Sequence, residues 1–126
     1  MKTFPPLFNV LAAMIAVTIL QACESQLGTG CVCAKPTLEP PNANGQTGTS
    51  VMVTIATTTT GASLRYTLDE STPSCGPSPH GTPIAAQSGR VPVPLVFGRT
   101  LKLQAIACKT GCTDSAIATG YYTPSN

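Results

Sequence analysis

Two segments of this chain alternate between two sets of side chains: residues 63–68 alternate between apolar and polar ones, and residues 101–108 place Leu101, Leu103, Ala105 and Ala107 opposite Lys102, Gln104, Ile106 and Cys108. The apolar residues of the first segment share one face: Leu64, Tyr66 and Leu68. The polar residues between them share the other face: Ser63, Arg65 and Thr67. A period of two residues is the geometry of a β-strand, whose successive side chains point to opposite faces. We therefore expect an antiparallel sheet with the leucine face buried and the serine face in water.

Further short strands are expected on both sides of these two segments. Residues 50–57 are rich in β-branched side chains, and Val51, Val53 and Ile55 fall on one face. Residues 84–86 are expected to form a short stretch of pairing at a sheet edge, and residues 115–123 are expected to form the last strand. Short strands at even spacing without a helical period are typical of sandwiches. The predicted fold class is all-β: a small immunoglobulin/fibronectin-III-like antiparallel β-sandwich of six to seven strands.

Proline and glycine indicate where the chain turns and which strand lies at an edge. Pro92 and Pro94 both lack an N–H on the same side of residues 90–97, so this segment is expected to be an edge strand or a bridge. The pair Asn44-Gly45 favours a tight turn because both residues tolerate positive φ. Residues 69–83 form a long loop, in which Asp69 is expected to accept hydrogen bonds from backbone N–H groups two or three residues on.

The N-terminal segment has the pattern of a bacterial export signal. A short positive start precedes an apolar run over residues 10–20, too short to span a bilayer, and Leu20-Gln21-Ala22-Cys23 resembles a lipobox. The predicted organisation is a signal peptide over residues 1–22, a lipid-anchored tether over residues 23–35, and a β-sandwich domain over residues 36–126. Cys23 is the predicted lipidation site, which includes palmitate-type acylation. The protein is then exported and anchored to the cell membrane or outer membrane.

The six cysteines favour disulfide bonds, since small exported domains rely on them. If Cys23 is acylated, five thiols remain and one must stay free or pair with another chain; otherwise three bridges can form. The disulfide candidates are Cys31, Cys33, Cys75, Cys108 and Cys112. Structural zinc sites prefer pairs of cysteines separated by two to four other residues, whereas only one residue separates Cys31 from Cys33, and this spacing argues against a metal site. No metal and no cofactor is predicted.

The charge of the chain argues against nucleic acid as a partner. The formal net charge is only +2, from seven basic and five acidic residues, and the basic residues are scattered. Phosphate backbones are bound by clustered lysines and arginines.

Several motifs resemble the chitobiase/β-hexosaminidase C-terminal domain family. The resemblance rests on residues 61–73 (GASLRYTLDESTP), preceded by VMVTI at residues 51–55 and followed by AIACKTG at residues 105–111. It covers about residues 36–123 and implies a fibronectin-like, non-catalytic sandwich of the kind appended to glycoside hydrolases or repeated in bacterial surface proteins. Glu70 stands where the family usually has glycine, so we expect the turn there to avoid positive φ. Cys112 stands where an aromatic residue is common.

The same resemblance implies a disulfide map. Related bacterial sequences carry cysteines at the positions of Cys75 and Cys108, which makes this pair the expected bridge. Cys112 is then expected to pair with Cys31 or Cys33, and a hairpin bridge between Cys108 and Cys112 is the alternative.

Catalysis is not predicted from the titratable residues. His80 is the only histidine and lies in a Pro/Ser/Gly loop, where an exposed structural role is the simpler interpretation. Asp69 and Asp114 are interpreted as turn caps and Glu70 as a solvated residue, although two carboxylates can also mark a glycosidase.

Sugar recognition depends on exposed aromatic rings, and the predicted mature chain offers four: Tyr66, Phe97, Tyr121 and Tyr122. Tyr66 is assigned to the core and Phe97 to the end of the proline strand. Tyr121 and Tyr122 are neighbours on one strand, so they point to opposite faces and one of them is expected to be exposed as a candidate ligand contact. An exposed tyrosine beside polar groups would favour sugar binding, and an exposed apolar patch or free edge would favour a protein partner.

The interpretation of the whole chain is a non-catalytic cell-envelope lipoprotein that displays a β-sandwich interaction module. Its predicted partners are the membrane, through the lipid anchor, and an envelope glycan or protein. The alternatives are a carbohydrate-binding accessory domain that acts with a glycoside hydrolase, and a structural spacer.

Overall fold

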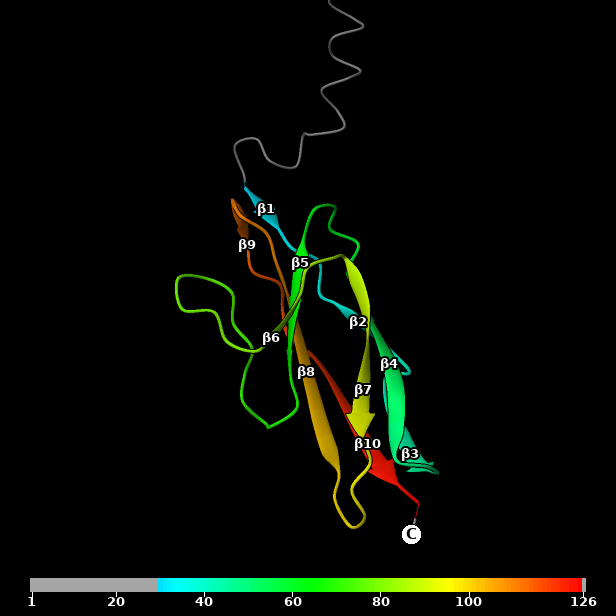
Figure 1. Ribbon diagram of the computed structural model, residues 1–126. Coiled ribbons are helices and arrows are strands. Elements are labelled where there is room, and N and C mark those ends of the chain that lie inside the picture. The colour runs from blue at the N-terminus through cyan, green and yellow to red at the C-terminus, as the bar shows by residue number, and fades with distance from the viewer. Residues whose placement is uncertain (1–29, 126) are drawn as a thin grey trace, which may run out of the picture. The chain divides into compact units, whose positions relative to one another are not determined.

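The computed structural model describes residues 30–125, which form β-strands and no helix (Figure 1). Ten strands follow one another: β1 (Cys31–Val32), β2 (Thr37–Glu39), β3 (Ala43–Gln46), β4 (Ser50–Ala56), β5 (Ser63–Thr67), β6 (Thr82–Ile84), β7 (Ser88–Pro94), β8 (Leu101–Cys108), β9 (Cys112–Thr113) and β10 (Ala118–Pro124). The predicted all-β class is confirmed, with more and shorter strands than the expected six to seven. The predicted signal peptide and Cys23 lie outside the described residues. Within those residues, no helix is long and apolar enough to cross a membrane.

The strands form an open sandwich of two sheets. The larger sheet has the order β3-β10-β8-β5-β6 and the smaller sheet the order β2-β4-β7, while β1 and β9 make a separate two-stranded pair. In Figure 1, β4 and β7 lie alongside β8 and β10 of the larger sheet. All pairings within the two sheets are antiparallel except that of β3 with β10, which is parallel. The expected antiparallel β-sandwich is confirmed, and the parallel pairing of β3 with β10 is a departure from it at this edge.

The hydrophobic core lies between the inner faces of the two sheets. Its central side chains are fully buried on β4, β5, β7 and β8: Val53, Ile55, Leu64, Val93 and Leu103. Each of these side chains stabilises the fold by about 1.5–3 kcal/mol, because folding removes its apolar surface from water. Val51, at the end of the predicted inner face of β4, is partly buried against this cluster. The period-two patterns therefore predicted the inner faces of β4 and β5 correctly.

β7 is an edge strand, as its two prolines predicted. The Leu95 N–H donates to the Thr49 carbonyl oxygen over 2.8 Å, so the odd-numbered residues of this stretch direct their N–H groups toward β4. Pro92 and Pro94 alternate with them, and their missing N–H groups fall on the free edge, where no strand pairs. This edge consequently offers few donors to an added strand.

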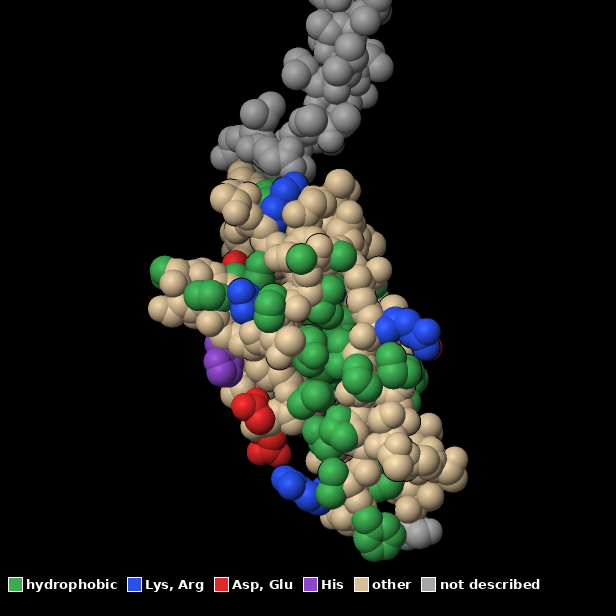
Figure 2. Space-filling view, in the orientation of Figure 1, with side chains coloured by type: hydrophobic (Ala, Val, Ile, Leu, Met, Phe, Trp, Pro, Cys, Tyr) green, Lys and Arg blue, Asp and Glu red, His purple; other side chains and the backbone are tan. Residues whose placement is uncertain are grey.

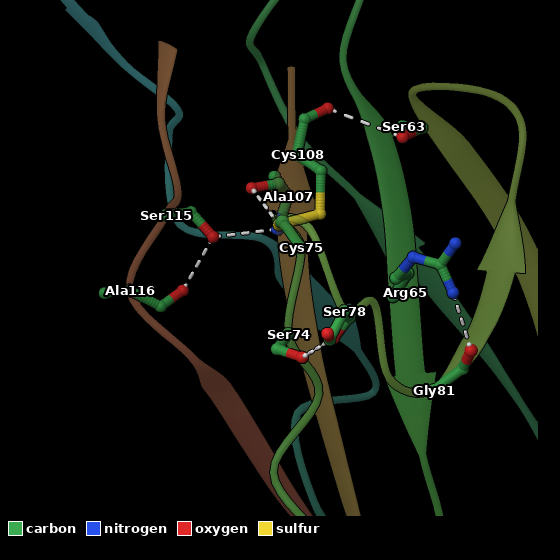
Figure 3. Close-up of a disulfide and its surroundings, with 10 residues drawn as sticks. All are labelled: Ser63, Arg65, Ser74, Cys75, Ser78, Gly81, Ala107, Cys108, Ser115 and Ala116. Atoms are coloured by element: carbon green, nitrogen blue, oxygen red, sulfur yellow. Dashed lines mark hydrogen bonds between the residues drawn. A yellow bond between two sulfur atoms is a disulfide. The ribbon is translucent and has the colours of Figure 1, made fainter. Parts of the chain in front are cut away.

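The outer face of β5 does not face water as predicted, because a loop covers it. We call residues 69–81 the strap. The Arg65 Nη1 donates to the Gly81 carbonyl oxygen over 2.9 Å and the Thr67 hydroxyl donates to the Ser71 carbonyl oxygen over 2.5 Å. In the middle of the strap, Cys75 is joined by a disulfide to Cys108 of β8, as Figure 3 shows. Thr67 is thereby buried, and the alternation seen in the sequence no longer separates core from solvent.

The folded body starts earlier than the predicted boundary at residue 36. Cys33 is only 3% exposed and belongs to the core cluster. The Ala34 N–H donates to the Thr59 hydroxyl over 2.7 Å, and the Thr57 hydroxyl donates to the Ala34 carbonyl oxygen over 2.9 Å. The Cys33 N–H also donates to the Thr113 carbonyl oxygen over 2.9 Å. The last residues assigned to the tether therefore belong to the β-sandwich.

The Asn44-Gly45 pair does not form the predicted tight turn. It lies within β3, which pairs with β10 in a register that shifts between Tyr122↔Ala43 and Pro124↔Gln46. The shift leaves one extra residue on β3, and Gly45 takes the positive φ of 65° there. The pair thus forms a bulge, the other common use of a glycine that tolerates positive φ.

The chain changes sheets between β2 and β3, and it passes close to β10 as it does so. The Tyr122 hydroxyl donates to the Pro40 carbonyl oxygen over 2.6 Å. A Cβ added to Gly120 would lie 2.5 Å from the Pro41 carbonyl oxygen, so only glycine allows this close approach. This crossing holds the outward-facing side chains at the end of β10 in a defined position.

Candidate functional site

Tyr121 and Tyr122 point to opposite faces of β10, as their adjacent positions predicted. Tyr122 is fully buried in the core, whereas Tyr121 is 48% exposed. The backbone N–H of Tyr121 donates to the Asn42 Oδ1 over 3.0 Å, which fixes the chain beneath its ring. Of the two candidate ligand contacts, Tyr121 is therefore the one that a ligand can reach.

Tyr121 lies opposite Lys102, and Lys102 leads to a hollow at the end of the larger sheet. The two residues are paired across β10 and β8, so their side chains lie on the same face. The hollow has a volume of about 360 Å³, and we call it the end hollow. It is lined by Leu68, Asp69, Glu70, Arg99, Thr100, Leu101 and Lys102. Lys102 thus lies next to the exposed ring of Tyr121 and also lines the polar end hollow.

The end hollow carries charges of both signs. Asp69 and Glu70 come from the turn after β5, Arg99 comes from the loop before β8, and Lys102 comes from the start of β8. None of these four side chains forms an ion pair with another residue of the described chain. Figure 2 shows acidic and basic side chains close together at the lower end of the visible face. These charged groups are therefore not neutralised by one another within the protein.

Asp69 caps the turn at the start of the strap, as predicted. Its Oδ1 accepts hydrogen bonds from the Ser71 N–H, over 3.2 Å, and from the Ser71 hydroxyl. The side-chain hydrogen bond from Ser71, the backbone bond and the nearby His80 lower the pKa of the Asp69 carboxyl below its usual value. Asp69 is consequently ionised in the folded protein down to lower pH than a free aspartate.

The structure brings His80 next to Ser71, a relationship that the sequence did not reveal. The His80 Nε2 lies 2.8 Å from the Ser71 Oγ, and a bridge between Ser74 and His80 closes the strap on itself. Because the Ser71 hydroxyl donates its proton to Asp69, the His80 Nε2–H is the donor in this contact. His80 is therefore not placed as a base that would activate Ser71. Nothing in the local sequence signals this fold-back of the strap.

Glu70 adopts a φ of 69°, and the expectation that its turn avoids positive φ is wrong. It is the only residue other than glycine with positive φ in the described part of the chain. The neighbouring hydrogen bonds from Ser71 to Asp69 and from Thr67 to the Ser71 carbonyl oxygen close the turn on both sides of Glu70. These bonds hold the backbone in the left-handed region, which costs a residue with a Cβ about 1–2 kcal/mol.

A second hollow, of about 380 Å³, is lined in part by Cys75 and Cys108, the two cysteines of the strap disulfide. Its lining includes Ser63, Lys109 and Asp114 together with the half-cystines. No aromatic side chain lines it, so it lacks the platform found next to the end hollow. Among residues 30–125, no group of histidine, cysteine and carboxylate side chains is arranged to hold a metal ion.

Of the five cysteines within the described residues, four are disulfide-bonded and one is a free thiol. Cys75 and Cys108 form the bridge that the resemblance implied, so the alternative hairpin bridge between Cys108 and Cys112 is wrong. Cys31 and Cys112 are also disulfide-bonded, whereas Cys33 is a free and buried thiol. Burial, with a smaller effect of Asp114, raises the pKa of the Cys33 thiol, and Lys109 opposes this only in part. Cys33 is therefore protonated and unreactive at neutral pH.

Phe97 does not close the proline strand as predicted. β7 ends at Pro94, and Phe97 lies in the following loop with 76% of its surface exposed. The same loop leads to Arg99, whose N–H donates to the Val96 carbonyl oxygen over 3.0 Å. Phe97 is thus a second exposed aromatic residue, two positions from a residue that lines the end hollow.

The fold and the disulfides define a class of protein: a small, disulfide-bonded β-sandwich of the accessory-domain type. The chain belongs to the chitobiase/beta-hexosaminidase C-terminal domain family, whose model matches residues 42–119, more than half of the sequence. The comparisons with curated proteins and with solved structures give no significant match. The family is one of carbohydrate-associated accessory modules, and the disulfide between Cys75 and Cys108 of this chain is typical of an exported protein. Tyr121 lies just beyond the matched segment.

Proposed function

We propose that this protein is a non-catalytic module of the bacterial cell envelope that binds a saccharide at Tyr121 and the end hollow. The observation that carries the proposal is the pairing of Tyr121, which is 48% exposed, with Lys102, which lines the hollow. The C–H faces of sugars stack on aromatic rings, and polar side chains next to the ring bond the sugar hydroxyls. Ligand sites of about 300–1,000 Å³ are typical, so the end hollow suits a unit of sugar size.

The β7 edge of the smaller sheet supports a glycan over a protein strand as the partner. An added strand needs the free N–H and C=O groups of an edge. On β7, Pro92 and Pro94 remove two of the donors on that edge. The site at Tyr121 uses side chains on an outer face instead and needs no free edge.

The hydrogen bonds of the polar side chains in the strap support a non-catalytic role. Asp69 caps a turn, and the proton of the Ser71 hydroxyl is donated to Asp69 and not to His80. This arrangement stabilises a loop, and a nucleophile would require the opposite direction of the histidine hydrogen bond.

A pull-down on insoluble chitin and on purified cell-wall sacculi tests saccharide binding by the full-length chain. We expect the protein to sediment with at least one of them, and Tyr121→Ala to weaken the binding about tenfold, which corresponds to about 1.4 kcal/mol. Met52→Ala, which changes an exposed apolar side chain on the smaller sheet, is the matched control and should bind as the native chain does. Equal binding by Tyr121→Ala, or no binding to either polymer, would contradict the proposal.

The membrane anchor is the second part of the proposal and rests on the sequence around Cys23. We expect the full-length protein to be recovered in the membrane fraction, with an intact mass that equals residues 23–126 plus acyl groups. Cys23→Ala should leave the protein unacylated and outside that fraction. A soluble native product without acyl groups would show that the anchor is wrong while leaving the saccharide site in place.

A further inference from the structure

The charged lining of the end hollow indicates which saccharide it takes. Asp69 and Glu70 lie on one of its two segments, and Arg99 and Lys102 on the other. We infer that the ligand is an amphoteric saccharide, which carries both an ammonium group and a carboxylate. This inference rests on the proposed function, because it assumes that Tyr121 and the end hollow bind a saccharide.

The four charged side chains of the end hollow form no ion pair within the described residues. Opposite charges that line one hollow without forming ion pairs keep their full attraction for groups that enter it. A neutral saccharide would remove water from all four charged groups without offering a group of opposite charge to any of them, which is unfavourable. A ligand with charges of one sign would be attracted by one pair and repelled by the other, while a ligand with both signs meets a complement on each side.

Glu70 adds a second, independent observation. Its φ of 69° is a conformation in which glycine would be free of strain. A carboxylate at the rim of the hollow is thus present despite about 1–2 kcal/mol of backbone strain. Strained residues are concentrated at functional sites, and a carboxylate facing a ligand ammonium would give this one a function.

The two parts of the proposed site bind different parts of the ligand. Tyr121 provides the platform for the sugar ring, and the end hollow, which begins at Lys102, takes the charged substituents. Asp69 can contribute through its second carboxylate oxygen, because the hydrogen bonds from Ser71 go to Oδ1. Peptide-bearing disaccharides of the cell wall have this combination of sugar, amine and carboxylate, and they serve as the probe.

The test is a titration of the full-length chain with three soluble probes at low and moderate salt. The probes are a disaccharide-tetrapeptide with free amine and carboxylates, the same compound with its amine acetylated, and a neutral chitin oligosaccharide. We expect the first to bind about tenfold more tightly than the other two, with a difference that shrinks as salt rises. Glu70→Gln should remove the preference for the free amine, and Arg99→Gln should weaken the peptide-bearing probes only.

Matched controls are Glu39→Gln and Arg90→Gln, exposed charges on the smaller sheet that do not line the hollow, and both should bind as the native chain does. Equal affinity for all three probes, with loss of all binding in Tyr121→Ala, would overturn the inference and leave the proposed function intact. Binding of no probe would overturn the proposed function and the inference with it.

Discussion

The Tyr122 hydroxyl donates a hydrogen bond to the Pro40 carbonyl oxygen over 2.6 Å, and this contact ties the last strand to the point where the chain changes sheets. Tyr122→Phe would leave the partly buried Pro40 carbonyl oxygen without its donor. We expect a loss of about 1–3 kcal/mol in the free energy of unfolding, measured by urea denaturation. Tyr121→Phe, which changes the exposed neighbour, should stay within about 0.5 kcal/mol. Equal effects of the two changes would contradict the assignment.

The same residue makes stability depend on alkaline pH. Burial, with a smaller effect of Glu39, raises the pKa of Tyr122 from its usual 10.0 to about 12. Because the folded pKa lies above the unfolded one, the contribution of Tyr122 is complete below about pH 10 and is lost as the pH rises toward about 12. Unfolding measured across this range should show a steeper decline for the native chain than for Tyr122→Phe. Parallel curves would show that Tyr122 does not titrate in this way.

Glu70→Gly should stabilise the fold, since it removes the Cβ from a residue with φ of 69°. The relief of about 1–2 kcal/mol is offset in part by the greater freedom of glycine in the unfolded chain, which leaves about 0.5–1 kcal/mol. The midpoint of urea denaturation is the measurement. Glu70→Ala keeps the Cβ and removes the charge, so it should give no gain. If alanine stabilised as much as glycine, the effect would come from the charge and not from the backbone.

Ser71→Ala should raise the pKa of Asp69 toward its usual value, because the hydrogen bonds from Ser71 are the largest cause of its lowered pKa. A lowered folded pKa means that Asp69 stabilises the protein above the unfolded pKa and that this contribution is lost as the pH falls through the folded pKa. NMR titration of the side-chain carboxyl is the direct measurement. Thr72→Ala, which changes an exposed neighbour, is the control and should leave the Asp69 pKa unchanged.

The disulfide between Cys75 and Cys108 should hold the strap on the sheet. Its removal by the double change Cys75→Ser and Cys108→Ser is expected to lower the free energy of unfolding by about 2–5 kcal/mol. The strap contains Glu70 and no lysine or arginine, so cleavage by a glutamate-specific protease reports its release. Cleavage after Glu70 should become faster in the variant, and an unchanged rate would show that hydrogen bonds alone hold the strap.

Peptide mapping under non-reducing conditions should recover Cys75 bonded to Cys108 and Cys112 bonded to Cys31. Cys33 should remain a thiol that resists alkylation until the protein unfolds, since it is buried and its pKa is raised. A peptide that joins Cys33 to Cys112 would contradict this map.

Much of the fold follows from local patterns. The alternation on β4 and β5 identified the inner face, because each inward side chain is two residues from the next. The prolines on β7 identified an edge, because a missing N–H is tolerated only where no strand pairs. Adjacent tyrosines on β10 had to lie on opposite faces, and Tyr121 is the exposed one of the two.

Other features could not be predicted because they depend on residues far apart in the sequence. Asn44-Gly45 has the local preferences of a turn, but pairing with β10 makes it a bulge within a strand. Cys33 lies in a segment without periodicity, and its burial depends on contacts with residues near 57–59 and 113. The Glu70 turn takes positive φ because hydrogen bonds on both sides of it hold the backbone there.

The amino-acid sequence by itself determined the all-β class, the inner faces, the family and the candidate tyrosines, because these depend on side-chain type and spacing along one strand. The tertiary structure alone decided that Tyr121 is the exposed member of the pair and that it adjoins a hollow with charges of both signs. That site joins β10, the start of β8 and the turn after β5, which are separated by up to about fifty residues of chain. Only the pairing of β10 with β8 and of β8 with β5 places these side chains within reach of one ligand.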